Sequence, residues 1–107
     1  MDSSYVTMIR ALNSPIRRII LRTMSDNAYS INELAEKLGA MNVDYKTRDS
    51  LYKQTELLVN AGLLDKFYDV NKKAISYRNP VIQVAIDIEN WVVENIREEK
   101  ESKILTS

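Results

Sequence analysis

The sequence predicts a mainly α-helical fold with one small β-hairpin, namely a winged helix-turn-helix followed by a long C-terminal helix. Three observations carry this prediction. A capping box opens a helix at Ser30, and a second amphipathic helix ends at Gly62. The apolar period then falls from about 3.6 residues to two over residues 63–78. Two helices joined by a turn and followed directly by a hairpin are typical of this fold.

Length and composition exclude several classes of protein. The 107 residues suit a single domain, and 45% of them are hydrophobic, as in ordinary globular proteins. The chain has no cysteine and no histidine, which excludes disulfides, thiol chemistry and the usual zinc ligands. It also has no glycine-rich phosphate loop, so we expect neither an enzyme nor a bound cofactor. The absence of long apolar runs and of a signal-like N-terminus predicts a cytoplasmic protein.

Two helices are expected before the capping box. Ser3 or Ser4 is a suitable cap for a first helix that runs to about Leu12. Ser14 and Pro15 then form a second start signal, because serine suits the N-cap and proline the first helical turn. The second helix should continue to about residue 24.

The helix-turn-helix is predicted over residues 30–62. Ser30 and Glu33 form the capping box of its first helix, and Gly39 stands where a left-handed C-cap is expected. Its second helix should run from about Asp44, read as a cap, to Ala61. The buried stripe expected on that helix comprises Leu51, Thr55, Leu58 and Ala61, with help from Leu57.

Period-two patterns predict a hairpin, or wing, after Gly62. Its strands are expected at residues 64–68 and 74–78, joined by a polar, basic turn at residues 69–73. Asn79 and Pro80 then open the predicted C-terminal helix of about 20 residues. We therefore expect a winged-helix domain over residues 1–79 and a C-terminal dimerisation helix and tail over residues 80–107.

Three stretches of the chain resemble a known family of regulators. Residues 12–21, 30–39 and 58–64 resemble ArsR-like prokaryotic repressors, and the likeness covers roughly residues 10–80. The connection after Gly39 is longer than in that family, and its metal-sensing cysteines have no counterpart here. This longer stretch and the long helix after the wing are closer to PadR-like regulators. Archaeal DNA-binding proteins of about this size are a third match, so the resemblance implies a prokaryotic, in particular archaeal, DNA-binding protein.

The resemblance places the recognition helix in the major groove of duplex DNA. Its expected contact residues are Tyr45, Lys46, Thr47, Arg48, Ser50, Lys53 and Gln54. Arg48 suits guanine, Gln54 suits adenine, and the two lysines suit phosphates. Asp49 is expected to pair with Arg48 or Lys53. The wing adds Lys72 and Lys73 at its tip, with Arg78 nearby, on the DNA backbone or in the minor groove.

The charge distribution permits such an interface although the net charge is zero. Residues 40–80 carry seven basic and five acidic side chains, whereas residues 81–107 carry three and six. An acidic tail that lies away from the DNA would leave the recognition helix and wing basic.

The C-terminal helix is predicted to hold two copies of the chain together. Its apolar positions recur at steps of three and four, and a winged helix already has a core without them. The expected interface comprises Val81, Val84, Ala85, Ile88, Trp91, Val92 and Ile96. A two-fold homodimer would place its recognition helices in successive major-groove turns.

The leading functional hypothesis is therefore a homodimeric transcriptional regulator, cytoplasmic and associated with the nucleoid. One alternative is an architectural chromatin protein that binds DNA with little sequence preference. The other is a protein-interaction module, since winged helices also serve as adaptors. The sequence leaves open the operator, the direction of regulation and any small-molecule effector.

Overall fold

The computed structural model describes residues 3–87 and 92–97 of the chain. Its helices are α1 (Ser3–Leu12), α2 (Pro15–Thr23), α3 (Ile31–Ala40) and α4 (Arg48–Asn60). Its strands are β1 (Tyr29–Ser30), β2 (Asp65–Asp69), β3 (Ala74–Arg78), β4 (Val81–Asp87) and β5 (Val92–Arg97).

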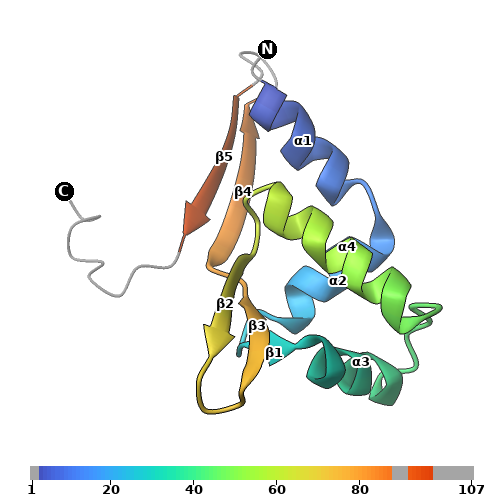
Figure 1. Cartoon of the computed structure of the whole chain (residues 1–107). Coiled ribbons are helices and arrows are strands. Elements are labelled where there is room, and N and C mark those ends of the chain that lie inside the picture. Colours follow the sequence, from blue (N-terminus) through green and yellow to red (C-terminus); the bar gives the residue numbers. More distant parts are fainter. Residues whose placement is uncertain (1–2, 88–91, 98–107) are drawn as a thin grey trace.

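The elements from α2 to β3 form a winged helix, as the sequence predicts. Strands β1, β3 and β2 make an antiparallel sheet in that spatial order, with Tyr29 opposite Tyr77 and Lys66 also opposite Tyr77. Helices α2, α3 and α4 pack together beside this sheet, and the β2–β3 hairpin extends from it as the wing (Figure 1). Helix α1 precedes this unit and packs on α2.

The hydrophobic core lies where the three helices meet the sheet. It draws apolar side chains from α2, α3, α4, β1 and β3 and from the turn after α4, and many of them are inaccessible to solvent. Its most deeply buried members are Ile20, Met24, Leu34, Leu38, Leu51, Leu58, Leu63 and Tyr77. This core orients α4 and the wing relative to each other.

Helix starts agree with the sequence prediction because capping is a local interaction. The Ser14 side chain accepts a hydrogen bond from the Arg17 amide at 3.4 Å, and Pro15 occupies the first turn of α2. At α3 the Ser30 hydroxyl accepts from the Glu33 amide at 3.2 Å. The Glu33 carboxylate accepts in return from the Ser30 amide at 3.0 Å, which completes the capping box.

The segment between α3 and α4 differs from the prediction in two ways. Gly39 lies inside α3, and the left-handed residue after the helix is Asn42, with φ of 60°. Asparagine tolerates this conformation better than most residues. Helix α4 begins at Arg48 rather than near Asp44, because Thr47 supplies the N-cap and its hydroxyl accepts from the Ser50 amide. The added residues therefore lengthen the connection and not the recognition helix.

The two glycines offer a matched test of this geometry. Gly62 has φ of 79° and ends α4, whereas Gly39 is helical, and a Cβ at either position would meet open space. Gly62→Ala should lower the free energy of unfolding by about 1–2 kcal/mol through left-handed strain. Gly39→Ala should raise it by up to about 1 kcal/mol through helix propensity. Urea unfolding measures the change in free energy of unfolding for each variant. Changes of the same sign in both variants would contradict the prediction.

Strand β1 has no counterpart in the sequence prediction. It has only two residues, and its pairing with β3 depends on contacts between segments 46 or more residues apart, which periodicity does not report. The wing agrees closely with expectation. Strand β3 occupies the predicted residues, and β2 lies one residue later than predicted.

The predicted C-terminal helix is wrong for the described residues. After Pro80 the chain forms the antiparallel strands β4 and β5, with Ile86 opposite Val93 and a register shift between Val81 and Gln83. Valine and isoleucine occupy eight of the positions 81–97, and such β-branched residues favour strands over helices. The three- and four-residue spacing of apolar positions therefore does not indicate a helix in this segment.

This change alters the predicted dimer interface. Consecutive strand residues belong to opposite faces of a sheet, so Val84 and Ala85 do not share a face as they would on one helical stripe. Val81, Val92 and Ile96 also lie in the hairpin, whereas Ile88 and Trp91 lie outside the described residues. Strand β5 contacts α1 (Figure 1). Within the described residues, each helix is too short or too polar to cross a bilayer.

Candidate nucleic-acid interface

The outer face of α4 carries a mixture of charged and aromatic side chains. Arg48, Asp49, Tyr52 and Lys53 are exposed in its first two turns, and Tyr52 retains 44% of its accessible surface. The buried stripe lies opposite, as predicted, except that Leu57 is exposed rather than buried. The N-terminal half of α4 is therefore available to a partner.

Arg48 is positioned by a neighbouring helix. Its guanidinium donates a hydrogen bond to the side-chain oxygen of Asn32 in the first turn of α3. A planar guanidinium has five donors, so one contact leaves most of them available to another acceptor. Sequence reasoning missed Asn32, because its contact with Arg48 spans 16 residues.

Asp49 pairs with Lys53, one of the two partners that the sequence left open. The carboxylate and the ammonium are 3.3 Å apart along the helix surface, and both side chains are more than two-thirds exposed. An exposed pair of this kind is worth at most about 1 kcal/mol. It therefore leaves Lys53 accessible to a competing anion.

Gln54 does not occupy the exposed position that the sequence predicts. Its side-chain oxygen accepts a hydrogen bond from Arg17 at 2.6 Å, and the residue is only partly exposed. Arg17 also donates to the carbonyl oxygens of Ala11 at 2.7 Å and Arg10 at 3.0 Å, and so connects α1, α2 and α4. Gln54 thus belongs to helix packing.

The residues just before α4 lie in a loop instead of on the helix. Tyr45 is half-buried and packs against the core, which corrects its prediction as an exposed contact residue. Asp44 caps no helix, because its carboxylate accepts from the Lys46 amide at 2.9 Å within the loop. Lys46 is exposed with φ of 76°. Thr47 and Ser50 are joined by the N-cap hydrogen bond.

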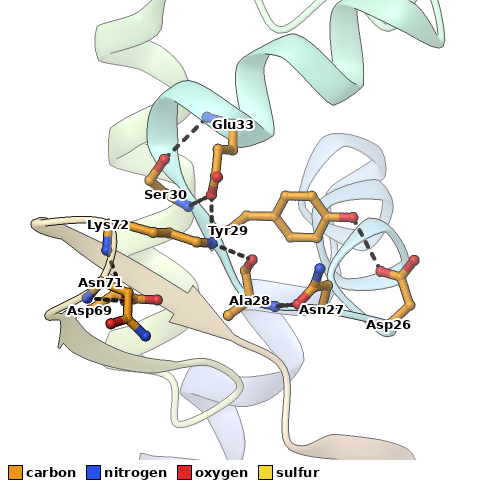
Figure 2. Close-up of polar contacts among 9 residues, drawn as sticks. All are labelled: Asp26, Asn27, Ala28, Tyr29, Ser30, Glu33, Asp69, Asn71 and Lys72. Carbon is orange, nitrogen blue, oxygen red and sulfur yellow. Dashed lines mark hydrogen bonds and ion pairs between the residues drawn. The ribbon is translucent and has the colours of Figure 1, made fainter.

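The basic residues of the wing differ in their environments. Lys72 turns back to α3, where its ammonium is 2.8 Å from the Glu33 carboxylate (Figure 2). Lys73 is exposed in the turn, with φ of 54°. Arg78 lies 3.7 Å from Asp65 on the adjacent strand, within the sheet rather than at the tip.

A partly buried cluster around one carboxylate joins α4 to the wing. Glu56 accepts from the Tyr77 hydroxyl at 2.7 Å and from the Lys66 ammonium at 2.8 Å. Partial burial by itself raises the pKa of the Glu56 carboxyl. Hydrogen bonds from Lys66 and Tyr77 outweigh that effect and hold the pKa below its ordinary value. Burial and the adjacent carboxylate both raise the pKa of Tyr77, so the phenol stays protonated as a donor.

This cluster predicts a component of acid sensitivity. A carboxylate with a lowered folded pKa stabilises the fold above its unfolded pKa, about 4.5, and loses that effect as the pH falls through the folded value. The free energy of unfolding of the wild type should therefore fall more steeply below about pH 5 than that of Glu56→Gln. Urea unfolding between pH 6 and 3 measures this difference, and parallel curves would contradict it.

A surface hollow of about 280 Å³ lies between the start of α3, α4 and the wing. Asn32, Tyr52, Lys66 and Ile75 line it with both polar and apolar groups. The sequence prediction did not include Tyr52 among the contact residues. Its position four residues after Arg48 on the same helix is the signal that could have placed it there. Lys66 is on the strand face shared with Tyr77, which only the register of the sheet reveals.

No family model matches the chain, and no curated protein matches it. The solved structures that match the chain include the following two. The ferric uptake regulator (Fur) of Vibrio cholerae is 10% identical, with a TM-score of 0.45 over 99% of this chain and 75% of that one. A manganese uptake regulator is 19% identical, with a TM-score of 0.43 over 99% of this chain and 71% of that one.

Proposed function

We propose that this protein is a transcriptional regulator that binds duplex DNA as a homodimer. The observation that carries the proposal is the outer face of α4, which presents Arg48, Tyr52 and Lys53 beside the exposed Lys46. Helix α4 is the second helix of the helix-turn-helix, the element that enters the major groove in proteins that use this motif to bind DNA. The wing would then meet the backbone or minor groove.

The contacts that we propose are narrower than the sequence alone implies. Arg48, held by Asn32, suits the O6 and N7 acceptors of guanine, while Lys46, Lys53 and Lys73 suit phosphates. Thr47 and Ser50 remain candidates for backbone contacts at the start of the helix. Tyr45, Gln54 and Arg78 are engaged within the protein and are left out of the proposed interface.

The dimer contact is proposed for the β4–β5 hairpin instead of a helix. An isolated two-stranded sheet is marginally stable in water, so a hairpin rich in valine and isoleucine benefits from further burial. A second copy could provide that burial in addition to α1. ArsR-like and PadR-like regulators of prokaryotes remain the families that we propose, with a place in the cytoplasm at the nucleoid.

Selection of bound duplexes from random DNA tests this function. A transcriptional regulator should yield a consensus with two related half-sites about one helical turn apart. Binding should weaken steeply with salt as counterions are released. Light scattering should show two copies of the chain. Recovery without a consensus would favour an architectural chromatin protein, and the absence of binding to any duplex at moderate salt would overturn both.

One observation favours a protein-interaction module as the second candidate function. The wing exposes the apolar side chains of Tyr68, Val70 and Ile75, with 74% of Val70 accessible to solvent. Tyr68 and Ile75 are directly opposite each other on one face of the hairpin. Such a patch is typical of protein contacts. A wing variant that loses a protein partner but keeps DNA affinity would support this role.

A further inference from the structure

The wing tip is tied to the first turn of α3 by one lysine. The Lys72 ammonium donates to Oε1 of Glu33 at 2.8 Å and to the carbonyl oxygen of Ala28 at 3.2 Å (Figure 2). About one-third of the lysine side chain and 44% of the glutamate side chain remain exposed. The contact is therefore formed at the surface, between segments about 40 residues apart.

The turn itself prepares Lys72 for this contact. One oxygen of the Asp69 carboxylate accepts from the Asn71 amide at 2.9 Å and from the Lys72 amide at 3.1 Å (Figure 2). These bonds define the backbone just before the lysine. Lys73 is the next residue, and it forms no ion pair with any residue that the structure describes. Of the two lysines at the wing tip, Lys72 is therefore held in an ion pair and Lys73 is not.

Glu33 serves two partners through the same oxygen. Its Oε1 accepts from the Ser30 amide as part of the capping box and from the Lys72 ammonium. The hydrogen bond from Lys72, followed by that from the Ser30 amide, holds the pKa of Glu33 below its ordinary value. The carboxylate is charged at neutral pH and balances the charge of Lys72 on the side of the molecule where we place DNA.

We propose that the Lys72–Glu33 pair is a latch that regulates the DNA interface. This inference rests on the proposed function. In the free protein the latch neutralises the wing-tip ammonium and holds the wing against α3. A DNA phosphate competes with Glu33 for the Lys72 ammonium, so the latch lowers the affinity of the protein for duplex DNA. Lys73 is available for the first phosphate contact without any such exchange.

The latch is expected to change affinity by a modest factor. A partly exposed ion pair stabilises a protein weakly, and its loss on binding corresponds to about a two- to fivefold reduction in affinity. A reduction of this size adjusts the affinity for DNA without preventing binding.

Glu33→Gln tests the latch while keeping the helix cap. Glutamine is also suitable at this position of a capping box, since its amide oxygen can accept from the Ser30 amide. Glu33→Gln should bind a duplex about two- to fivefold more tightly than the wild type. Combining it with Lys72→Gln should abolish that gain relative to Lys72→Gln alone. Glu36→Gln removes the same charge from an exposed position of α3, and its small effect should not depend on Lys72.

The outcomes separate the latch from the proposed function. Suppose that the wild type binds DNA. If Glu33→Gln does not raise the affinity, or raises it equally when combined with Lys72→Gln, the latch is wrong. In that case Glu33 acts at most by repelling DNA. If the wild type binds no duplex, the proposed function fails and the regulation with it. An NMR titration of the Glu33 carboxyl tests the contact without DNA. Its pKa should rise in Lys72→Gln, and an unchanged value would overturn the latch.

Discussion

Replacing Leu58 with alanine is expected to lower the free energy of unfolding by about 2–5 kcal/mol. The leucine is completely buried in the middle of the core, on the inner face of α4. Its removal would leave a cavity where α4 meets the other helices, because close-packed surroundings relax only partly. Domains of this size are stable by about 5–15 kcal/mol in total, so the variant should show a clearly reduced urea midpoint.

Leu57 supplies the matched control for that experiment. It precedes Leu58 on the same helix but retains 46% of its accessible surface, so Leu57→Ala should change stability by no more than about 0.5–1 kcal/mol. Both variants lose the same atoms and keep a good helix former. Equal losses of stability would show that the packing of α4 against the core is different from that described.

Joint replacement of Lys46, Arg48 and Lys53 by alanine is expected to weaken binding to the selected duplex by at least about a hundredfold. The three cations are on or next to the exposed start of α4, and the variant would lose two phosphate contacts and one base contact. The slope of log affinity against log salt should also decrease in magnitude by about 2 if the two lysines contact phosphates. Fluorescence anisotropy titrations at several salt concentrations measure both quantities.

A variant of equal charge change separates local contact from long-range attraction. Arg10, Arg22 and Lys37 are on α1, at the end of α2 and near the end of α3, outside the proposed interface. Their joint replacement by alanine should reduce affinity by less than about tenfold, since exposed charges beyond about 10 Å are largely screened at ordinary salt. If both triple variants lost affinity equally, α4 would not be the recognition helix.

The winged-helix core could be predicted because its signals are local. Ser14 and Ser30 cap helices through bonds to amides three residues away, and Gly62 ends α4 with a positive φ that few other residues adopt. The alternation of residues 74–78 similarly indicates a strand. Such features depend on a few neighbouring residues, so the sequence alone determines them.

The prediction failed where one stretch of sequence is compatible with both a helix and a strand. Residues 81–97 contain apolar side chains at helical spacing, but many of them are β-branched, and the chain forms the β4–β5 hairpin. Propensity favoured strands while spacing favoured a helix, and pairing with a second strand decided between them. The start of α4 is a similar case. Asp44 and Thr47 are both good caps, but the positive φ of Lys46 is incompatible with a helix that begins at Asp44, so α4 begins after Thr47.

The availability of each proposed contact residue was decided by tertiary structure. The sequence identified Arg48, Lys53 and Lys72 as cations near a helix-turn-helix and its wing. Only the folded chain joins Arg48 to Asn32 and Lys72 to Glu33. A side chain that reaches across 16 or 39 residues finds its partner through the packing of α3, α4 and the wing. The sequence by itself therefore determined the winged helix, and long-range packing decided which of its charges are free to bind.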